Sequence, residues 1–220
     1  MTTARDQRDA SRSRANILDA AERLFVARGF ESTSLAEIAA DAGLSRATPS
    51  YFFGNKEQLY IAVLERVFAE REEATREAFE PLVAWAAGDG SGSLEAALTA
   101  AVEGYFSFLQ ERPAFVRLLQ TEELRGGRQL RAVHRDSAAM SDAFAAVRRV
   151  AGRRGLRSFR VADAVLVLVS LTFSPLTQGS TFMLALRRDL DDARTRRAHI
   201  RLVVDQVMSA ISGGSSSPRR

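Results

Sequence analysis

Apolar residues recur along this chain at the three- and four-residue intervals of a helix surface, and strand-type alternation is scarce. Ile17, Ala21, Leu24 and Phe25 form the first such stripe, and Gly29 ends it. Further stripes follow, separated by breaks that contain glycine or proline. The pattern predicts an all-α protein of about nine helices.

The starts of several helices can be predicted from side chains that bind free backbone amides. Ser34 and Glu37 have the spacing of a capping box, in which each side chain bonds to the backbone N–H of the other residue. Comparable signals predict further helix starts at Ser45, Asn55, Ser93 and Pro113.

Glycine and proline predict where helices end. Gly43 and Gly54 follow the second and third helices, and Pro81 marks either the end of the long fourth helix or a kink in it. Residues 87–92 are rich in glycine and predict a linker or loop. The last amphipathic stripe ends before residue 213.

The most apolar run, residues 161–173, contains Asp163 and is shorter than the roughly 20 residues of a membrane span. We interpret it as a helix that is buried on nearly all sides. Residues 1–14 lack the apolar stretch of a secretion signal. We therefore expect a cytoplasmic protein without a membrane partner.

The second and third predicted helices are short, and the tight turn 42–44 joins them. Ala39 is small enough for a close crossing of two helices, and Gly43 tolerates positive φ. The third helix exposes hydrogen-bonding side chains of a size to reach DNA. This pattern favours a helix-turn-helix, although a generic pair of short helices would share its periodicity.

The N-terminal quarter, about residues 13–64, carries a specific pattern in segments 17–21, 24–25, 29–30, 33–35, 38–39, 42–45 and 51–59, with Thr48. In these residues it resembles the DNA-binding domain of the TetR family of transcriptional regulators. The resemblance implies an all-α homodimer with a variable C-terminal ligand domain. The last two long helices would then pair with their copies in a four-helix bundle.

The resemblance also implies which residues contact double-stranded DNA. Thr33 and Lys56 occupy positions at which the family touches phosphates, and Lys56 lies near a helix N-terminus. The other expected contacts are Ser45, Arg46, Thr48, Ser50 and Tyr51. Arg46 is suited to a guanine edge or a phosphate and Tyr51 to a phosphate or a thymine methyl, and the sequence leaves both choices open.

The chain departs from the family at Thr48-Pro49-Ser50, where the family more often has a non-proline residue followed by an aromatic one. Pro49 falls in the first turn of the third helix, so its missing amide removes only a first-turn bond. The sequence therefore does not determine which operator the protein reads, or whether the phosphate contact of the usual aromatic residue is made.

The predicted organisation is a disordered arm over residues 1–12, a DNA-binding domain over 13–58, a ligand-binding and dimerisation domain over 59–212, and a disordered tail over 213–220. Aromatic residues of the second half are candidates for an apolar pocket, although aromatics at helical spacing are also ordinary core. The expected lining is Trp85, Tyr105, Phe106, Phe115, Gln120, Glu123, His134, Met140, Phe144, Phe173 and Gln178. The expected dimer interface is Val165, Leu168, Val169, Val203, Val204, Val207, Met208 and Ile211, and His199 is expected on a solvated face.

We therefore predict a TetR-like repressor that binds a palindromic operator as a homodimer and is released by a small-molecule effector. One alternative is a helix-turn-helix regulator controlled by a protein partner without a small-molecule effector. Another is a helical ligand-binding or enzymatic protein that has lost DNA binding. An enzyme is not expected, because neither a glycine-rich phosphate loop nor a Ser-His-Asp arrangement stands out.

Composition narrows the chemistry further. The chain has no cysteine and two histidines, so we expect neither a metal site nor a cofactor. Its net charge is +4, and 30 of its 31 basic residues are arginine, a ratio that a genome-wide codon bias would explain. The surplus lies outside residues 1–58, which include the predicted DNA-binding domain and are neutral. Residues 59–115 are acidic and residues 116–160 are basic, so we expect the two segments to offset each other across packed helices, although the basic one would also suit an anionic ligand.

Overall fold

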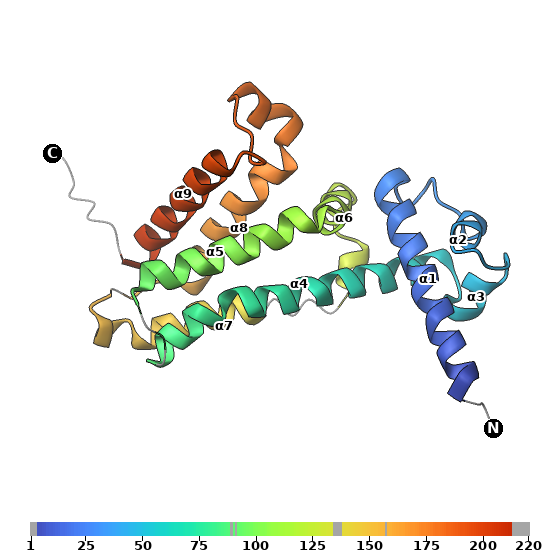
Figure 1. The fold of residues 1–220 in the computed structure, drawn as a ribbon, viewed down its shortest axis with the longest axis horizontal. Coiled ribbons are helices and arrows are strands. Elements are labelled where there is room, and N and C mark those ends of the chain that lie inside the picture. The colour runs from blue at the N-terminus through green and yellow to red at the C-terminus, as the bar shows by residue number, and fades with distance from the viewer. Residues whose placement is uncertain (1–3, 89, 91, 134–137, 157, 213–220) are drawn as a thin grey trace. The chain divides into compact units, whose positions relative to one another are not determined.

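The computed structural model describes residues 4–88, 90, 92–133, 138–156 and 158–212. These residues form nine α-helices and contain no strand, which confirms the predicted all-α fold (Figure 1). The helices are α1 (Ala4–Arg28), α2 (Leu35–Asp41), α3 (Thr48–Phe53), α4 (Lys56–Ala87), α5 (Leu94–Glu111), α6 (Pro113–Leu124), α7 (Ala138–Val150), α8 (Val161–Thr177) and α9 (Ala193–Ser212). The same residues also form two short 3₁₀ turns, at Gln129–Arg131 and Gly152–Arg154, and a π-helical turn at Gly179–Met183.

The described chain divides into two compact units. The first holds α1, α2, α3, the start of α4, and α6, and the second holds the remainder of α4 with α5, α7, α8 and α9. This division differs from the predicted border between residues 58 and 59. The difference arises because α6 packs against α1, and because Phe115 of α6 meets Phe68 with ring centroids 5.3 Å apart.

An aromatic cluster forms the centre of the first unit. Phe25, at the end of α1, lies 4.9 Å from Tyr60 of α4 and 5.9 Å from Phe30, measured between ring centroids. Phe30 itself lies 5.0 Å from Tyr60. All three side chains are buried, so the apolar stripe of α1 is covered by the first turns of α4.

Ion pairs join α1 to its neighbours in the first unit. Arg66 of α4 bonds to Asp19 at 2.6 Å and to Glu22 at 2.5 Å. Arg23 and Arg28 of α1 bond to Asp41 and Glu37 of α2 at 2.7 and 3.0 Å. The pairs to α2 are largely exposed and act mainly on orientation, whereas the Glu22 carboxylate is nearly buried.

The first helix begins at Ala4, not near Ser13, which corrects the predicted disordered arm for the described residues 4–12. Residues 4–28 contain neither glycine nor proline, so nothing in them interrupts a helix. Residues 6–12 are nevertheless exposed, and the packing of α1 begins near Ile17.

Three predicted helix starts are confirmed by hydrogen bonds. Ser34 and Glu37 form the capping box of α2, and Ser93 caps α5 by accepting from the N–H of Ala96 at 3.1 Å. Asn55 and Gln58 cap each other at the start of α4, at 2.8 and 3.2 Å.

The prediction that Ser45 caps the third helix is wrong. The helix begins at Thr48 after Ala47, and the Ser45 hydroxyl bonds to the hydroxyl of Thr48 at 2.7 Å. Pro49 therefore lies in the first turn, where no amide has a partner within the helix, so its ring removes no helical hydrogen bond.

Two prolines lie inside helices, and neither ends its helix. α4 continues past Pro81 to Ala87, and α8 continues past Pro175 to Thr177. In α4 the buried side chains of Phe79, Leu82 and Trp85 lie on both sides of Pro81. Their packing outweighs the lost backbone bond, so the helix persists.

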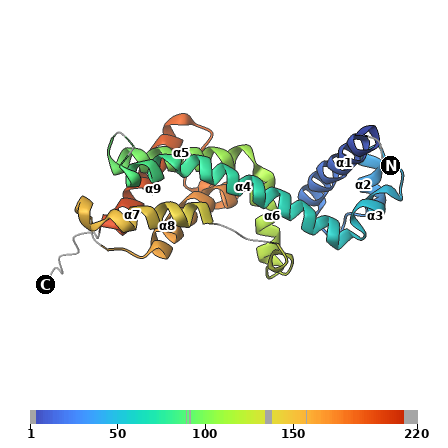
Figure 2. The same ribbon diagram turned by 90° about the horizontal axis from the view of Figure 1, so that it is seen from below.

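The second unit is built around edge-to-face contacts of aromatic rings. Phe79 of α4 lies 6.3 Å from Tyr105 of α5 and 6.0 Å from Phe144 of α7. Burial raises the pKa of Tyr105 to about 12. Helix α9 packs beside α8 and α5 in this unit (Figures 1 and 2).

His199 of α9 is buried, contrary to the expected solvated face. Its Nε2 donates to the carbonyl of Leu171 in α8 at 2.9 Å, and its ring centroid lies 5.9 Å from that of Phe106 in α5. Burial lowers the pKa of this imidazole.

Most of the expected dimer residues lie inside the second unit. Those with 3 % exposure or less are Leu168, Val203, Val204, Val207 and Ile211. The correction has a simple cause: the most apolar stripe of an amphipathic helix packs first against its own chain. Val165, Val169 and Met208 stay half-buried, and the exposed Leu166 and Leu202 were not predicted.

We expect Gly54→Ala to destabilise the protein more than Gly43→Ala does. Gly43 has φ of +68° and open space around it, so alanine there adds only left-handed strain of about 1–2 kcal/mol. Gly54 has φ of +78° and ψ of −91°, and an added Cβ would overlap the side-chain oxygen of Gln58 that caps α4. Urea unfolding at equal pH measures both losses, and equal losses would contradict this account.

Candidate nucleic-acid interface

The turn between α2 and α3 fixes how the two helices cross. Gly43 supplies the positive φ of the turn, and the N–H of Leu44 donates to the carbonyl of Ala39 at 2.9 Å. Ile38 and Ala39 are fully buried below this turn. The predicted helix-turn-helix geometry is therefore present, with the small side chain of Ala39 at the crossing.

Three expected contact residues, one just before α3 and two within it, are exposed to solvent. Arg46, Ser50 and Tyr51 are exposed, and the Tyr51 side chain is 84 % exposed. The ring of Tyr51 packs edge to face on that of Phe52, with the ring centroids 5.2 Å apart. This contact orients the tyrosine side chain without burying it. Thr48 is half-buried, and its hydroxyl is bonded to Ser45.

Arg14 of α1 supports the end of α3, a role that no sequence signal suggested. Its guanidinium lies 4.3 Å from the ring centroid of Phe53, and its Nη1 donates to the carbonyl of Phe52 at 3.5 Å. A cation at the carbonyl end of a helix is favourable because free carbonyls gather there.

Thr33 does not face solvent, which corrects the expected role of its side chain. The residue is 2 % exposed, and its hydroxyl donates to the carbonyl of Gly29 at 2.9 Å. In this arrangement the hydroxyl holds the turn between α1 and α2 and is unavailable to a phosphate.

Lys56 lies at the first position of α4 and is half-buried. Its Nζ donates to the carbonyls of Phe30 and Glu31 at 3.0 and 3.4 Å. The ammonium has a third N–H, so these bonds do not exhaust its donors.

These elements surround an open hollow on the first unit. It is lined by residues 31–37 together with Arg46, Ser50 and Lys56. Glu37 adds a carboxylate, but this group is already engaged with Ser34 and Arg28, and hydrogen bonds from Ser34 hold its pKa below the ordinary value. Glu31 adds a second carboxylate, which is paired with Arg125 at 2.9 Å. With both carboxylates engaged, the cations of Arg46 and Lys56 and the Ser50 hydroxyl give the hollow an arrangement that suits a phosphate backbone.

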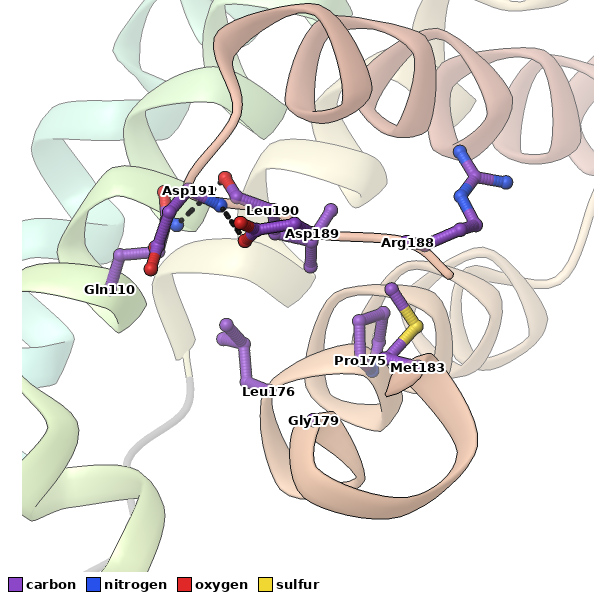
Figure 3. A pocket seen from close by; sticks show the side chains of 9 residues that line it. All are labelled: Gln110, Pro175, Leu176, Gly179, Met183, Arg188, Asp189, Leu190 and Asp191. Atoms are coloured by element: carbon purple, nitrogen blue, oxygen red, sulfur yellow. Dashed lines mark hydrogen bonds between the residues drawn. The ribbon is translucent and has the colours of Figure 1, made fainter. Parts of the chain in front are cut away.

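A second hollow, of about 300 Å³, lies in the second unit at the connection between α8 and α9 (Figure 3). Its apolar lining is Pro175, Leu176, Met183 and Leu190, and its polar lining is Gln110, Arg188, Asp189 and Asp191. Gln110 and Asp191 lie at one end, and the side chain of Arg188 extends at the other (Figure 3). The Gln110 amide donates to the carbonyl of Leu190 at 3.5 Å.

The expected ligand-pocket residues do not form one cluster. Phe115, Gln120 and Glu123 belong to α6 and the first unit. Those in the second unit are Trp85, Tyr105, Phe106, Met140, Phe144, Phe173 and Gln178, and His134 lies outside the described residues. Tyr105, Phe106 and Phe144 are buried in the core, and Gln178 is exposed at the end of α8. Both hollows take their lining from other residues, which a helical pattern cannot indicate because loops contribute half of it.

The described residues contain no helix that is long and apolar enough to cross a membrane. In the same part of the chain, no three acidic or histidine side chains gather in a way that would hold a metal ion.

Two family models match the chain. Residues 17–63 match the bacterial regulatory proteins of the TetR family, and residues 95–207 match a tetracyclin repressor-like C-terminal domain. The HTH-type transcriptional repressor NicS of Pseudomonas putida is 28% identical over 209 residues, covering 92% of this chain and 93% of NicS. The HTH-type transcriptional regulator RutR of Escherichia coli is 41% identical over 86 residues, covering 38% of this chain and 41% of RutR.

Solved structures share the fold over nearly the whole chain. A TetR-family regulator of Mesorhizobium loti superposes with a TM-score of 0.70 at 21% identity, covering 92% of this chain and 98% of that one. One from Marinobacter aquaeolei has a TM-score of 0.66 at 23% identity, covering 94% and 98%.

We expect Thr33→Val to lower stability without changing the affinity of the folded protein for DNA. Valine keeps the shape of threonine but loses the bond to Gly29, which costs about 1 kcal/mol. Thermal unfolding and DNA titrations at several salt concentrations measure the two effects. A loss of DNA affinity without a loss of stability would instead assign the Thr33 hydroxyl to a contact with the DNA.

Proposed function

The chain belongs to the TetR family of bacterial regulatory proteins, and from that premise we propose that it is a repressor released from its operator by a small molecule. Membership makes it a helix-turn-helix transcriptional regulator of a non-enzymatic family. Repression, a palindromic operator, a homodimer and the effector are parts of the proposal. NicS, a repressor by name, matches over most of the chain and supports repression.

One observation carries the DNA-binding part of the proposal: the hydrogen-bonding side chains of Arg46, just before α3, and of Ser50 and Tyr51 within it are exposed to solvent. Within the described residues, the Arg46 side chain has no hydrogen bond or ion pair, and Tyr51 and Ser50 lie open beside it. Lys56 lies across the same hollow. We assign Arg46, Ser50 and Tyr51 to the major groove and Lys56 to a phosphate, while Ser45 and Thr48 support the start of α3.

We place the homodimer interface on the outer faces of α8 and α9. Leu166 is 65% exposed and Leu202 is 42% exposed, and the half-buried Val165, Val169 and Met208 lie on the same two helices. Exposed leucines are costly in water, and a second copy would cover them. A dimer matches the two-fold symmetry of a palindromic operator.

We place the effector in the hollow between α8 and α9 shown in Figure 3. Its apolar floor suits a ring or a short chain, and the end at Gln110 and Asp191 offers oxygen acceptors to a protonated amine. Gln110 lies near the end of α5, which is followed directly by α6 of the first unit. An occupant therefore contacts the segment through which the second unit connects to α6.

Selection of bound sequences from a random pool of double-stranded DNA tests the proposal. We expect a palindrome with half-sites about one helical turn apart, and two chains for each selected site by native mass. Arg46→Ala should cost about 1–3 kcal/mol and relax the selected sequence at one position if Arg46 reads a base. Lys56→Gln should weaken binding to all sequences alike and lower the salt slope by about one.

Arg149→Ala is the matched control, because Arg149 is an exposed arginine on α7 of the second unit. It should bind the selected DNA like the unaltered protein. Failure of the selection to enrich any sequence, or equal losses in Arg149→Ala and Arg46→Ala, would refute the assignment.

We expect benzylamine to raise the Tm of the protein and to weaken its operator binding, whereas phenylacetate should do neither. The amine matches the oxygen acceptors at one end of the hollow, and a ligand at 100 times its Kd stabilises the fold by about 2.7 kcal/mol. Gly179→Phe should abolish the shift, because Gly179 lines the hollow and has no atom within 4 Å of its added Cβ position. If benzylamine raised the Tm of Gly179→Phe by the same amount, the amine would bind outside this hollow.

A further inference from the structure

The turn that leads from α1 into α2 is held by two cations from distant parts of the first unit. Lys56 donates to the carbonyls of Phe30 and Glu31, and Arg125, which follows α6, bonds to the Glu31 carboxylate at 2.9 Å. Both cations also lie on the ring of Phe30. The Lys56 nitrogen is 4.4 Å and the Arg125 guanidinium carbon 4.7 Å from the ring centroid.

Arg125 is itself fixed to the end of α6. Its backbone N–H donates to the carbonyls of Thr121 and Glu122, and its Nη1 lies 3.9 Å from the Glu122 carboxylate. That carboxylate is fully buried and also accepts from the N–H of Gln129 at 3.1 Å. The Arg125 side chain is 26% exposed, so its position is set by packing and pairing together.

The turn to which Arg125 bonds leads into the residues that begin α2. Phe30 and Glu31 lie within four residues of Thr33, whose hydroxyl holds the turn, and of Ser34, which caps the helix. α2 in turn packs against α3. A displacement of residues 30 and 31 would therefore move the helix against which the recognition helix packs.

We propose that Arg125, which lies outside the helix-turn-helix, is a positioning residue for operator binding. It joins the end of α6 to the turn at Phe30 and Glu31, and so holds α2, α3 and Lys56 in the arrangement that fits DNA. This inference rests on the proposed DNA-binding function and adds a residue that does not touch the DNA. It also makes operator affinity depend on the end of α6, a helix that follows directly on α5 of the second unit.

The rival assignment is a direct phosphate contact by Arg125, and salt dependence separates the two. A residue that touches a phosphate releases counterions, so its loss lowers the salt slope by about one, whereas loss of a positioning residue leaves the slope unchanged. Glu31 gives a second distinction. Removing this carboxylate strengthens DNA binding if charge alone matters, but weakens it if the pair with Arg125 positions the turn.

The experiment measures affinity for the selected operator at several salt concentrations, together with Tm, for Arg125→Gln, Arg125→Lys, Glu31→Gln and the double variant Arg125→Gln/Glu31→Gln. We expect Arg125→Gln to weaken binding about tenfold with an unchanged slope, through loss of the ion pair and the stacked guanidinium together. Arg125→Lys should recover part of the loss, because the ammonium keeps the ion pair. Glu31→Gln should weaken binding about threefold, and the double variant should bind no more weakly than Arg125→Gln.

Arg117→Gln is the matched control, since Arg117 is an exposed arginine of α6 and the charge change is the same. It should bind like the unaltered protein. The inference is overturned if Arg125→Gln keeps full affinity, if its salt slope falls by about one, or if Glu31→Gln binds more tightly. Because Glu31 is 79% exposed, its variant tests the proposal even if Arg125→Gln unfolds. If the unaltered protein selects no operator, the proposed function itself fails.

Discussion

The packing of Phe30 between the end of α1 and the start of α4 is the constraint on which the first unit depends. Its ring contacts Phe25 and Tyr60, and the ammonium of Lys56 lies above it. α2 has seven residues and α3 has six, lengths at which an isolated helix is not stable in water. Both helices therefore take their position from the contacts around Phe30 and from the turn that follows it.

Local signals in the sequence were sufficient for much of the fold. The capping box at Ser34, the cap at Asn55 and the positive φ of Gly43 each depend on residues a few positions apart, so the sequence contains the whole interaction. The sequence left open whether α4 ends at Pro81 or continues past it, because packing from other helices decides between the two. The same holds for His199 and the inner face of α9: periodicity shows that a face is apolar but not which surface covers it.

In the candidate site, too, the sequence predicted the residues that depend on local structure and not those that depend on distant contacts. Arg46, Ser50 and Tyr51 are exposed as expected, because a short helix leaves its outer residues open. Thr33 faces inward because the carbonyl that it bonds lies in the turn, and Arg14 and Arg125 reach the site from segments far from it in sequence. Counts of charge along the sequence also fail to show which distant residues pair. Arg125 belongs to the basic segment 116–160, yet the carboxylates that it pairs with in the described structure are Glu31, of the neutral segment 1–58, and Glu122 of its own segment.

The geometry around Lys56 gives a physical reason for lysine at this position in a chain that otherwise uses arginine. The ammonium directs two donors at the carbonyls of Phe30 and Glu31, which lie in different directions, and it keeps a third N–H. A guanidinium holds its donors in one plane, and this geometry suits a bidentate partner such as a carboxylate. It is less suited to two separate carbonyls together with a third acceptor, such as a phosphate, on another side. A phosphate that takes the third donor would thus bind a nitrogen already fixed by the turn, with little further loss of side-chain entropy. The contact that positions the lysine and the contact proposed for DNA are therefore compatible.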